Sequence, residues 1–273
     1  MMRKALTIAG SDSGGGAGIQ ADLKTFQELE VFGMSALTAV TAQNTLGVHG
    51  VYPMTPEAVI SQIQAIGDDM GTDAIKTGML FNAEIIEAVA GQIKKYKWET
   101  IVVDPVMIAK GGASLLQNEA ISALKKFLLP HALVITPNIP EAEVLTGMTI
   151  HTAHEKQEAA KKLFELGVKN IIIKGGHDED PAESTDLLFD GSEFYTFTSR
   201  RMNTKNTHGT GCTFSAAITA ELAKGVNIYD AVVTGKGFIQ AAIEDQIDIG
   251  HGHGPTNHSA YRKRNMVKEH AGR

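Results

Sequence analysis

The apolar positions of this chain alternate between two patterns, short runs rich in β-branched residues and longer stretches with helical spacing. The short runs predict strands, and the longer stretches predict helices between them. Strands that alternate with helices are typical of a mostly parallel sheet with helices on both faces. The predicted strands are Ala5–Ala9, Ser35–Ala42, Ala74–Thr77, Thr100–Val103, Ala132–Thr136, Asn170–Lys174, Thr185–Phe189 and Glu193–Thr198. The predicted helices are Gly18–Glu30, Pro56–Asp69, Ala83–Lys95, Glu119–Leu128, Ile139–Leu145, Ala153–Leu166, Thr213–Lys224 and Tyr229–Glu244.

The region Asp186–Thr198 departs from the parallel pattern, because Asp190-Gly191 stands between two apolar runs. An Asp-Gly pair between such runs favours a tight antiparallel hairpin. No repeat, low-complexity linker or block of like charges marks a boundary between domains. We therefore expect one α/β domain over residues 1–273.

Glycine-rich or polar segments follow the predicted strands. Each of them could be no more than a turn from strand to helix. In a parallel α/β sheet, however, ligands bind at the carboxyl ends of the strands, so the shared position of these segments predicts a single site. The segments are Gly10–Gly18, Gln43–Thr45, Lys76–Met79, Asp104–Met107, Thr136–Asn138 and Lys174–His177.

Composition limits the partners of such a site. The chain carries 25 basic and 31 acidic residues, a net charge of −6, which gives no general attraction to nucleic acid or to an anionic membrane. The single cysteine excludes an intrachain disulfide and a cysteine-based zinc cluster, and it fits a reducing compartment. The apolar run Ala5–Ala9 is too short for a signal peptide or a membrane span. We expect a cytoplasmic protein whose partners are small molecules.

The run Asn206–Thr213, Asn-Thr-His-Gly-Thr-Gly-Cys-Thr, indicates a glycine turn that opens a helix. Gly209 and Gly211 would leave backbone N–H groups and the positive end of the helix dipole directed at one anion. A helix N-terminus also lowers a thiol pKa from about 8.5, so the thiolate of Cys212 is expected to be favoured. An anion site beside a potential base suits phosphoryl transfer. The alternative is that Cys212 is a small buried hydrophobic residue.

The loop Gly10–Gly18 is neither a Walker A loop nor a Gly-x-Gly-x-x-Gly fingerprint. Its structural interpretation is a flexible turn before the next helix. Its functional interpretation is a close approach of the backbone at Gly10 to a flat ligand, with Asp22 on the first turns of the helix as a polar partner.

Gln43 carries an amide that both donates and accepts, as the edge of an aminopyrimidine requires, although a glutamine after a strand is commonly a surface residue. Met79 would supply an adaptable apolar wall or ordinary core packing. Asn138 and Glu141 have the spacing of a helix cap. Lys174 would be placed to meet triphosphate oxygens or, alternatively, would be solvated.

The run from Asn206 to Thr213 resembles a signature of the ribokinase-superfamily small-molecule kinases. Cysteine in place of the usual aspartate is similar to the hydroxymethylpyrimidine (phosphate) kinase branch and its pyridoxal kinase relatives. The Gly10–Gly18 loop, continued through Ile-Gln-Ala-Asp, resembles the same branch, and the likeness extends from Lys4 to His258. It implies a ribokinase-like α/β fold and ATP-dependent phosphorylation of 4-amino-5-hydroxymethyl-2-methylpyrimidine, and then of its monophosphate, in thiamine biosynthesis. We also expect a homodimer.

The resemblance also implies a role for each candidate residue. Cys212 would be the base, and Gly209 and Gly211 would hold the transferred phosphoryl group. Mg²⁺ would be organised by carboxylates, and it needs only one or two of them beside water and phosphate oxygens. The substrate-binding residues would be Gln43, Asp22, Met79 and Gly10, the nucleotide-binding residues Asn138, Lys174, Thr207, Gly209 and Gly211, and the metal-binding residues Glu141 and Asp104.

Two other functions remain open at this point. Pyridoxal kinases of this branch share Cys212 but tend to have Met at the position of Gln43, and some carry a second cysteine in the segment equivalent to residues 106–110. A non-catalytic nucleotide or vitamin sensor could use the same fold. His251, His253 and His258 could suggest a metal site, but no acidic or cysteine partner is nearby in the sequence, so we expect a glycine-rich loop near the nucleotide.

Overall fold

The computed structural model describes residues 1–107, 118–177 and 182–271. Within them the strands are β1 (Lys4–Asp12), β2 (Phe32–Asn44), β3 (Gly47–Pro53), β4 (Ala74–Thr77), β5 (Ile101–Val103), β6 (Val134–Ile135), β7 (Asn170–Ile173), β8 (Glu183–Phe189) and β9 (Phe194–Arg200). The α-helices are α1 (Gly18–Glu28), α2 (Pro56–Asp69), α3 (Ala83–Tyr96), α4 (Asn118–Ala123), α5 (Ile139–Thr146), α6 (Ala153–Phe164), α7 (Thr210–Ala223), α8 (Ile228–Glu244) and α9 (Ala260–Ala271). Shorter helical turns are η1 (Leu124–Leu128), η2 (Leu129–His131) and η3 (Gly175–His177).

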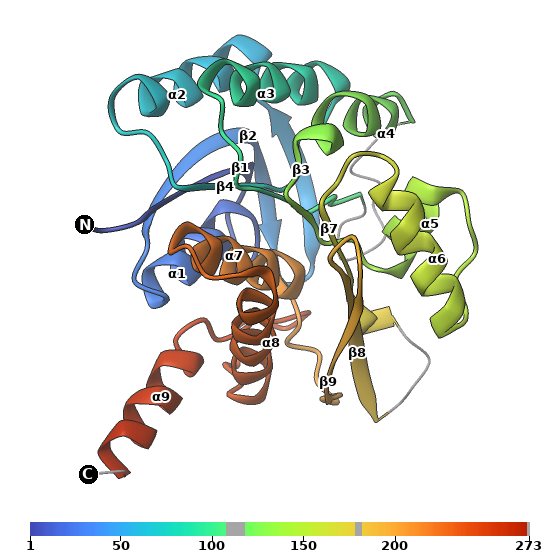
Figure 1. Ribbon diagram of the computed structural model, residues 1–273. Helices are drawn as coiled ribbons and strands as arrows, with labels where there is room; N and C mark the ends of the chain where they lie inside the picture. The colour runs from blue at the N-terminus through green and yellow to red at the C-terminus, as the bar shows by residue number, and fades with distance from the viewer. Residues whose placement is uncertain (108–117, 178–181, 272–273) are drawn as a thin grey trace.

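All the described strands belong to one sheet in the order β3-β2-β1-β4-β5-β6-β7-β8-β9. The pairs from β2 to β7 are parallel, whereas β3, β8 and β9 pair antiparallel with their neighbours. The predicted hairpin is confirmed, with Gly191 at a φ of 95° between β8 and β9. The mostly parallel sheet and the helices on both faces are also confirmed (Figure 1).

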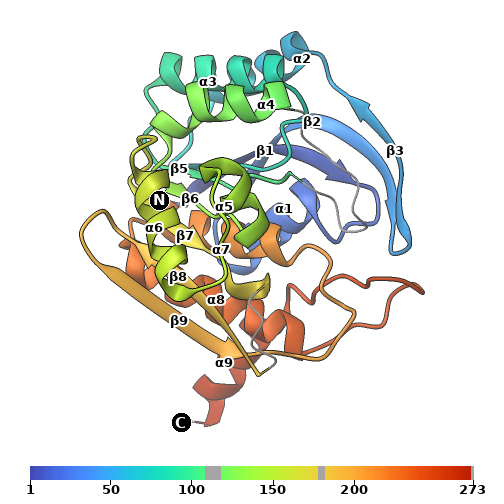
Figure 2. The same cartoon turned by 90° about the vertical axis from the view of Figure 1, so that its right-hand side faces the viewer.

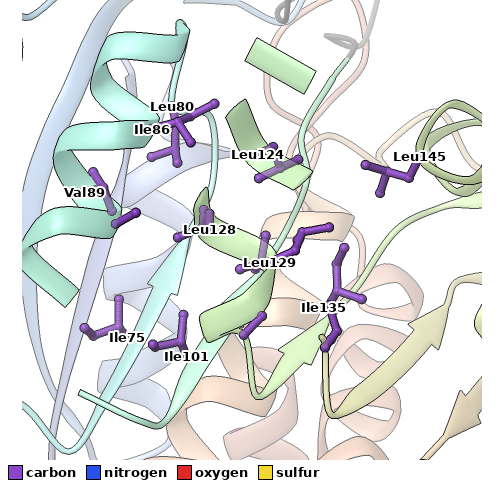
Figure 3. Close-up of a cluster of buried hydrophobic side chains, with 14 of the residues drawn as sticks. Ile75, Leu80, Ile86, Val89, Ile101, Leu124, Leu128, Leu129, Ile135 and Leu145 are labelled. Carbon is purple, nitrogen blue, oxygen red and sulfur yellow. The ribbon is translucent and has the colours of Figure 1, made fainter. Parts of the chain in front are cut away.

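The two faces of the sheet are covered by different helices. Figures 1 and 2 show α2, α3 and α4 on one face and α1, α7 and α8 on the other. Side chains alternate between these layers along each buried strand. In β7, Ile171 and Ile173 pack with the cluster under α3 and α6, whereas Ile172 packs with Phe214 of α7. Figure 3 shows part of the first cluster, in which Ile75, Ile101 and Ile135 of adjacent strands face leucines of η1 and η2.

The structure contains elements that the pattern did not predict. The strand β3 has two glycines and a proline within Gly47–Pro53 and forms the edge of the sheet, so its apolar signal is weak. The helix α9 is dominated by polar residues and has no clear apolar stripe. The helix predicted over Glu119–Leu128 changes to a π-helical turn at η1. The helix predicted from Thr213 begins earlier, at Thr210, so that Gly211 and Cys212 lie in its first turn.

Candidate active site

A cavity of about 650 Å³ lies at the carboxyl ends of the strands. It is lined by residues from all the segments that were expected to share one edge of the sheet, so that expectation is confirmed. The wall formed by β8, β9 and α8 was not expected, because the residues there carry no motif. The additional lining residues include Ser184, Asp186, Arg200, Arg201, Met202, Lys236, Ile239, Gln240 and Ile243.

The start of α7 forms the floor of this cavity. Gly209 has a φ of 83°, and a Cβ atom there would overlap the carbonyl oxygen of Gly16, so only glycine fits both the conformation and the contact. The two glycine loops therefore touch at this point. Because the first N–H groups of a helix have no partner within it, those of Gly211 and Cys212 are available to an anion in the cavity. The geometry agrees with the predicted anion site.

Cys212 does not have the lowered pKa that its position at a helix N-terminus suggested. Burial raises the pKa of the thiol to about 11, and the charges of Asp22 and Asp104 act in the same direction. The ammonium of Lys76 and an N–H bond from Gly18 oppose this rise without cancelling it. In the ligand-free protein Cys212 is therefore a neutral thiol, because the loss of solvation outweighs the helix dipole.

Beside Cys212, Lys76 and Asp22 form an ion pair with no exposed side-chain surface. Lys76 Nζ lies 2.8 Å and 2.9 Å from the two carboxylate oxygens, and Thr7 donates its hydroxyl to the same carboxylate at 2.6 Å. The charge of Asp22 keeps the pKa of Lys76 above its ordinary value although burial lowers it. Lys76 lines the cavity and Asp22 does not. Asp22 is therefore placed to hold Lys76 and not to touch a ligand directly, which corrects its expected position.

The expected apolar and amide walls lie together on one side of the cavity. Gly10, Gln43 and Met79 all line it, from the ends of β1, β2 and β4 respectively. Met79 is only 8% exposed and its backbone oxygen accepts a hydrogen bond from Thr38, so it serves both as core packing and as cavity wall. A Cβ atom at Gly10 would meet the terminal methyl group of Met79, so the two residues share the same part of the wall.

Sequence reasoning missed Asp12. Its carboxylate accepts N–H bonds from Gly14, Gly16 and Ala17 at 2.8 Å to 3.0 Å, and it lies 2.8 Å from Nε2 of His208. Burial raises the pKa of Asp12, but the bonds from His208 and the loop amides outweigh burial and leave the pKa below its ordinary value. The signal in the sequence was an acidic residue two positions before a run of glycines, whose free N–H groups need an acceptor.

Asn138, Glu141, Asp104 and Lys174 meet on the other side of the cavity. Asn138 and Glu141 form the predicted capping box at the start of α5, and both also line the cavity. Lys174 is not solvated, since its Nζ lies 3.0 Å from Asp104 Oδ1 and 3.9 Å from Glu141 Oε2. This part of the site is therefore a cation shared by two carboxylates.

The two carboxylates differ in their tendency to ionise. Burial raises the pKa of Asp104, but the charges of Lys174 and Lys76 outweigh it and the pKa lies below its ordinary value. For Glu141, burial and the nearby charge of Asp104 outweigh Lys174 and raise the pKa. Asp104 therefore carries the charge that pairs with Lys174, while Glu141 gains most from an added cation.

The remaining predicted residues have mixed positions. Thr207 lines the cavity. The histidine-bearing loop does not, because Gly252 and His253 donate backbone bonds to Thr45, next to the Gln43 side of the site. The same loop also bonds to the segment directly before the anion-binding turn, because Thr256 donates its N–H to His208 O, so its expected position near the nucleotide stays a prediction. Within the described residues no cluster of metal-ligating side chains is found, and Ile108–Lys110 of the segment compared with pyridoxal kinases lie outside them. Over the same described ranges, no helix is long and apolar enough to cross a membrane.

Known proteins resemble this chain over nearly its whole length. The phosphomethylpyrimidine kinase family model matches residues 12–257. A hydroxymethylpyrimidine/phosphomethylpyrimidine kinase of Bacillus subtilis is 58% identical over 96% of this chain and 97% of its own length. A pyridoxine kinase of the same organism is 47% identical over 96% and 97%. Among solved structures, an ADP complex of Bacillus subtilis pyridoxal kinase has a TM-score of 0.89 and 45% identity, covering 96% of this chain and all of that one.

Proposed function

Because the chain belongs to the phosphomethylpyrimidine kinase family, we propose that its cavity performs the two phosphorylations of that family. The protein is a phosphotransferase of thiamine biosynthesis, and it uses ATP to phosphorylate 4-amino-5-hydroxymethyl-2-methylpyrimidine and then the monophosphate. The observation that carries the choice of substrate is Gln43 at the cavity wall, since its amide complements an aminopyrimidine edge.

The reaction joins the two sides of the cavity. The hydroxymethyl oxygen attacks the γ-phosphorus of ATP, the bond to the bridging oxygen breaks, and ADP leaves. The hydroxyl proton passes to Sγ of Cys212, which accepts it in the minor thiolate form, because burial keeps most of the thiol protonated in the ligand-free protein. The N–H groups of Gly211 and Cys212 stabilise the negative charge on the transferred group, because phosphoryl transfer depends chiefly on positioning and electrostatics. In the second reaction a phosphate oxygen attacks, which is already largely ionised near neutral pH.

On the other side of the cavity, Lys174, Asn138 and Thr207 are proposed to bind the nucleotide phosphates. Asp104 and Glu141 are proposed to hold Mg²⁺, which would neutralise charge on the phosphates. The donor set fits that ion, because both carboxylates line the same wall and Mg²⁺ takes one or two of them with water and phosphate oxygens.

Parallel steady-state kinetics with the hydroxymethylpyrimidine, its monophosphate and pyridoxal test the proposed function. We expect the highest kcat/KM for the two pyrimidines. Gln43→Met should raise the KM for the hydroxymethylpyrimidine about 5- to 100-fold, because it removes a paired amide, and leave the KM for ATP unchanged. A wild-type preference for pyridoxal would replace this function by vitamin B6 salvage, and ATP hydrolysis without a phosphorylated product would favour a sensor.

We also propose that the protein is a homodimer. The proposal is supported by exposed apolar side chains on β2, on the edge strand β3 and at the turn between them, since an unpaired edge invites association. The exposed residues are Phe32, Val40, Leu46 and Tyr52. Light scattering of the purified protein should give twice the chain mass of 29.2 kDa, and the mass of a single chain would refute the proposal.

A further inference from the structure

His208 lies where three segments of the chain meet, directly before the anion-binding turn. Its backbone N–H donates to Gly254 O at 3.0 Å, and its carbonyl accepts from Thr256 at 3.4 Å, so the backbone is fixed. Its ring extends toward the ends of β1 and β2. There Nε2 lies 2.8 Å from Asp12 Oδ2 and 3.3 Å from the amide of Gln43. One ring atom thus joins the first glycine loop to the end of β2.

The contact with Asp12 determines where the proton of His208 sits. Two lone pairs cannot face each other at 2.8 Å, so Nε2 must carry a hydrogen and donate it to Oδ2. Asp12 is an acceptor near neutral pH, because its pKa lies below the ordinary value. Nε2 of His208 is therefore a donor in both the neutral and the protonated ring, and it has no lone pair to offer to Gln43.

This donor decides which way the Gln43 amide is turned. The nitrogen and oxygen of a side-chain amide have nearly the same shape, so the contacts decide between them. With Nε2 of Gln43 at 3.3 Å from His208 Nε2, two donors would face each other. The contact is favourable only when the amide is turned by 180°, so that Oε1 faces the ring and accepts, at 3.3 Å, a secondary share of the one hydrogen that Nε2 donates mainly to Asp12.

The other end of the amide gives the same answer independently. It lies 3.3 Å from the hydroxyl of Thr41, and that hydroxyl donates its hydrogen to Ser11 O at 2.9 Å. The Thr41 oxygen can therefore accept a hydrogen but has none left to give. It requires the NH₂ group of Gln43 at this end, which again places Oε1 toward His208. Both ends of the amide are fixed in the same sense.

We propose that His208 is the positioning residue that sets the polarity with which Gln43 reads the ring of the substrate. With Oε1 held by His208 and the NH₂ group held by Thr41, Gln43 keeps one N–H and one oxygen lone pair for a ligand. These match a ring nitrogen that accepts and an exocyclic amino group that donates. The inference rests on the proposed function and extends it from Gln43 to the residue that orients Gln43.

A 4-oxo analogue of the hydroxymethylpyrimidine tests the polarity. Its ring N–H donates and its carbonyl accepts, so it presents the reverse of the aminopyrimidine edge with almost the same shape. Gln43 could pair with it only after turning by 180°, which His208 and Thr41 oppose. We expect the wild-type protein to favour the amino compound over the oxo compound in kcat/KM by at least about 100-fold, because mismatched buried polar groups are strongly rejected.

Three variants separate positioning from mere packing. His208→Phe keeps the ring but removes the donor, so the amino-to-oxo ratio of kcat/KM should fall at least about tenfold while the KM for ATP stays unchanged. His208→Gln keeps an N–H near the position of Nε2 and should retain the wild-type ratio. Thr41→Val releases the other end of the amide and should also lower the ratio. His49→Phe, at an exposed position on β3, is the matched control and should leave the ratio unchanged.

A double-variant cycle completes the test. If His208 acts through Gln43, adding His208→Phe to Gln43→Met should change neither kcat/KM value further. The inference would be overturned if His208→Phe and Thr41→Val lowered kcat/KM equally for the amino and the oxo compound, so that their ratio did not change. It would also be overturned if His208→Phe lowered kcat/KM as strongly in the Gln43→Met background as in the wild type. Absence of pyrimidine kinase activity in the wild type would instead overturn the proposed function itself.

Discussion

Two lysines line the same cavity, and each is paired with an aspartate. Lys76 has no exposed side-chain surface and is bound by both oxygens of Asp22. The side chain of Lys174 is 15% exposed, and it shares its charge between Asp104 at 3.0 Å and Glu141 at 3.9 Å. The first pair is closed to solvent, because neither side chain is exposed and only Lys76 borders the cavity. The second is open, so phosphate oxygens can compete for its cation.

The comparison shows that similar ion pairs can serve different purposes. Cys212 lies in the electrostatic field of both lysines, with Lys76 as the main favourable charge on its thiol. The closed pair provides a constant field at the proposed base, and the open pair provides a cation that a nucleotide can bind. Each of the following predictions tests one side of this difference.

The largest expected effect is at the residue between the two pairs. Cys212→Ala removes the proposed base but leaves the backbone N–H groups, so phosphorylation of the hydroxymethylpyrimidine should fall about 10²- to 10⁴-fold. Phosphorylation of the monophosphate should fall less, because its attacking oxygen is already anionic. The KM for ATP should not change, and Cys212→Asp should restore part of the first activity. Steady-state kinetics with both substrates measure this, and equal losses in both steps would reduce Cys212 to a packing role.

Breaking the closed pair should cost folding stability. Lys76→Met leaves the buried carboxylate of Asp22 without its partner and should lower the free energy of unfolding by about 3–5 kcal/mol. Adding Asp22→Leu should recover most of that loss, because an apolar pair can replace a buried ion pair. Urea denaturation of both variants measures this. A small loss in Lys76→Met would mean that the pair is not closed.

The raised pKa of Cys212 predicts slow alkylation. The chain has one cysteine, so labelling by iodoacetamide reports on it alone. With a pKa of about 11, the ligand-free protein should react about a few hundredfold more slowly at pH 7.5 than a free thiol. The rate should then rise about tenfold per pH unit up to that pKa. A rate that levels off near pH 8 in the folded protein would contradict the raised pKa.

Breaking the open pair should affect ligand binding more than folding. Lys174→Met should raise the KM for ATP about 10- to 100-fold, because it removes a charged hydrogen-bond donor to phosphate. Its loss of unfolding free energy should be smaller than that of Lys76→Met, since Asp104 keeps the hydroxyl of Ser215 and partial access to the cavity. The same kinetic and urea measurements on the two lysine variants form a matched pair. Equal destabilisation by both would remove the distinction between them.

The smallest expected effect concerns magnesium. In Glu141→Gln the new amide oxygen can still accept the N–H of Asn138 at the start of α5, but the negative charge beside Lys174 is lost. Half-maximal activity should therefore require about three- to tenfold more Mg²⁺. The thermal unfolding temperature of this variant serves as a control for the cap. A magnesium titration that overlays that of the wild type would leave Asn138 and Glu141 as a helix cap only.

The sequence predicted most of the strands and helices because the signals for them are local. The alternation of strand and helix patterns, the hairpin at Asp190-Gly191 and the capping box at Asn138 each depend on residues close together in the chain. The edge strand β3 and the polar helix α9 escaped because their sequences carry no clear apolar alternation or apolar stripe. The shared edge of the sheet followed from topology alone.

The sequence by itself therefore determined the fold class and the segments that meet at the carboxyl ends of the strands, but not the cavity wall formed by β8, β9 and α8. Only the tertiary structure decided how the residues of these segments pair. Asp22 meets Lys76 across 54 positions and Asp12 meets His208 across 196, and no local pattern records such partners. The pKa of Cys212 was misjudged for the same reason: the helix terminus is visible in the sequence, whereas the burial that outweighs it arises when separate segments close around the thiol.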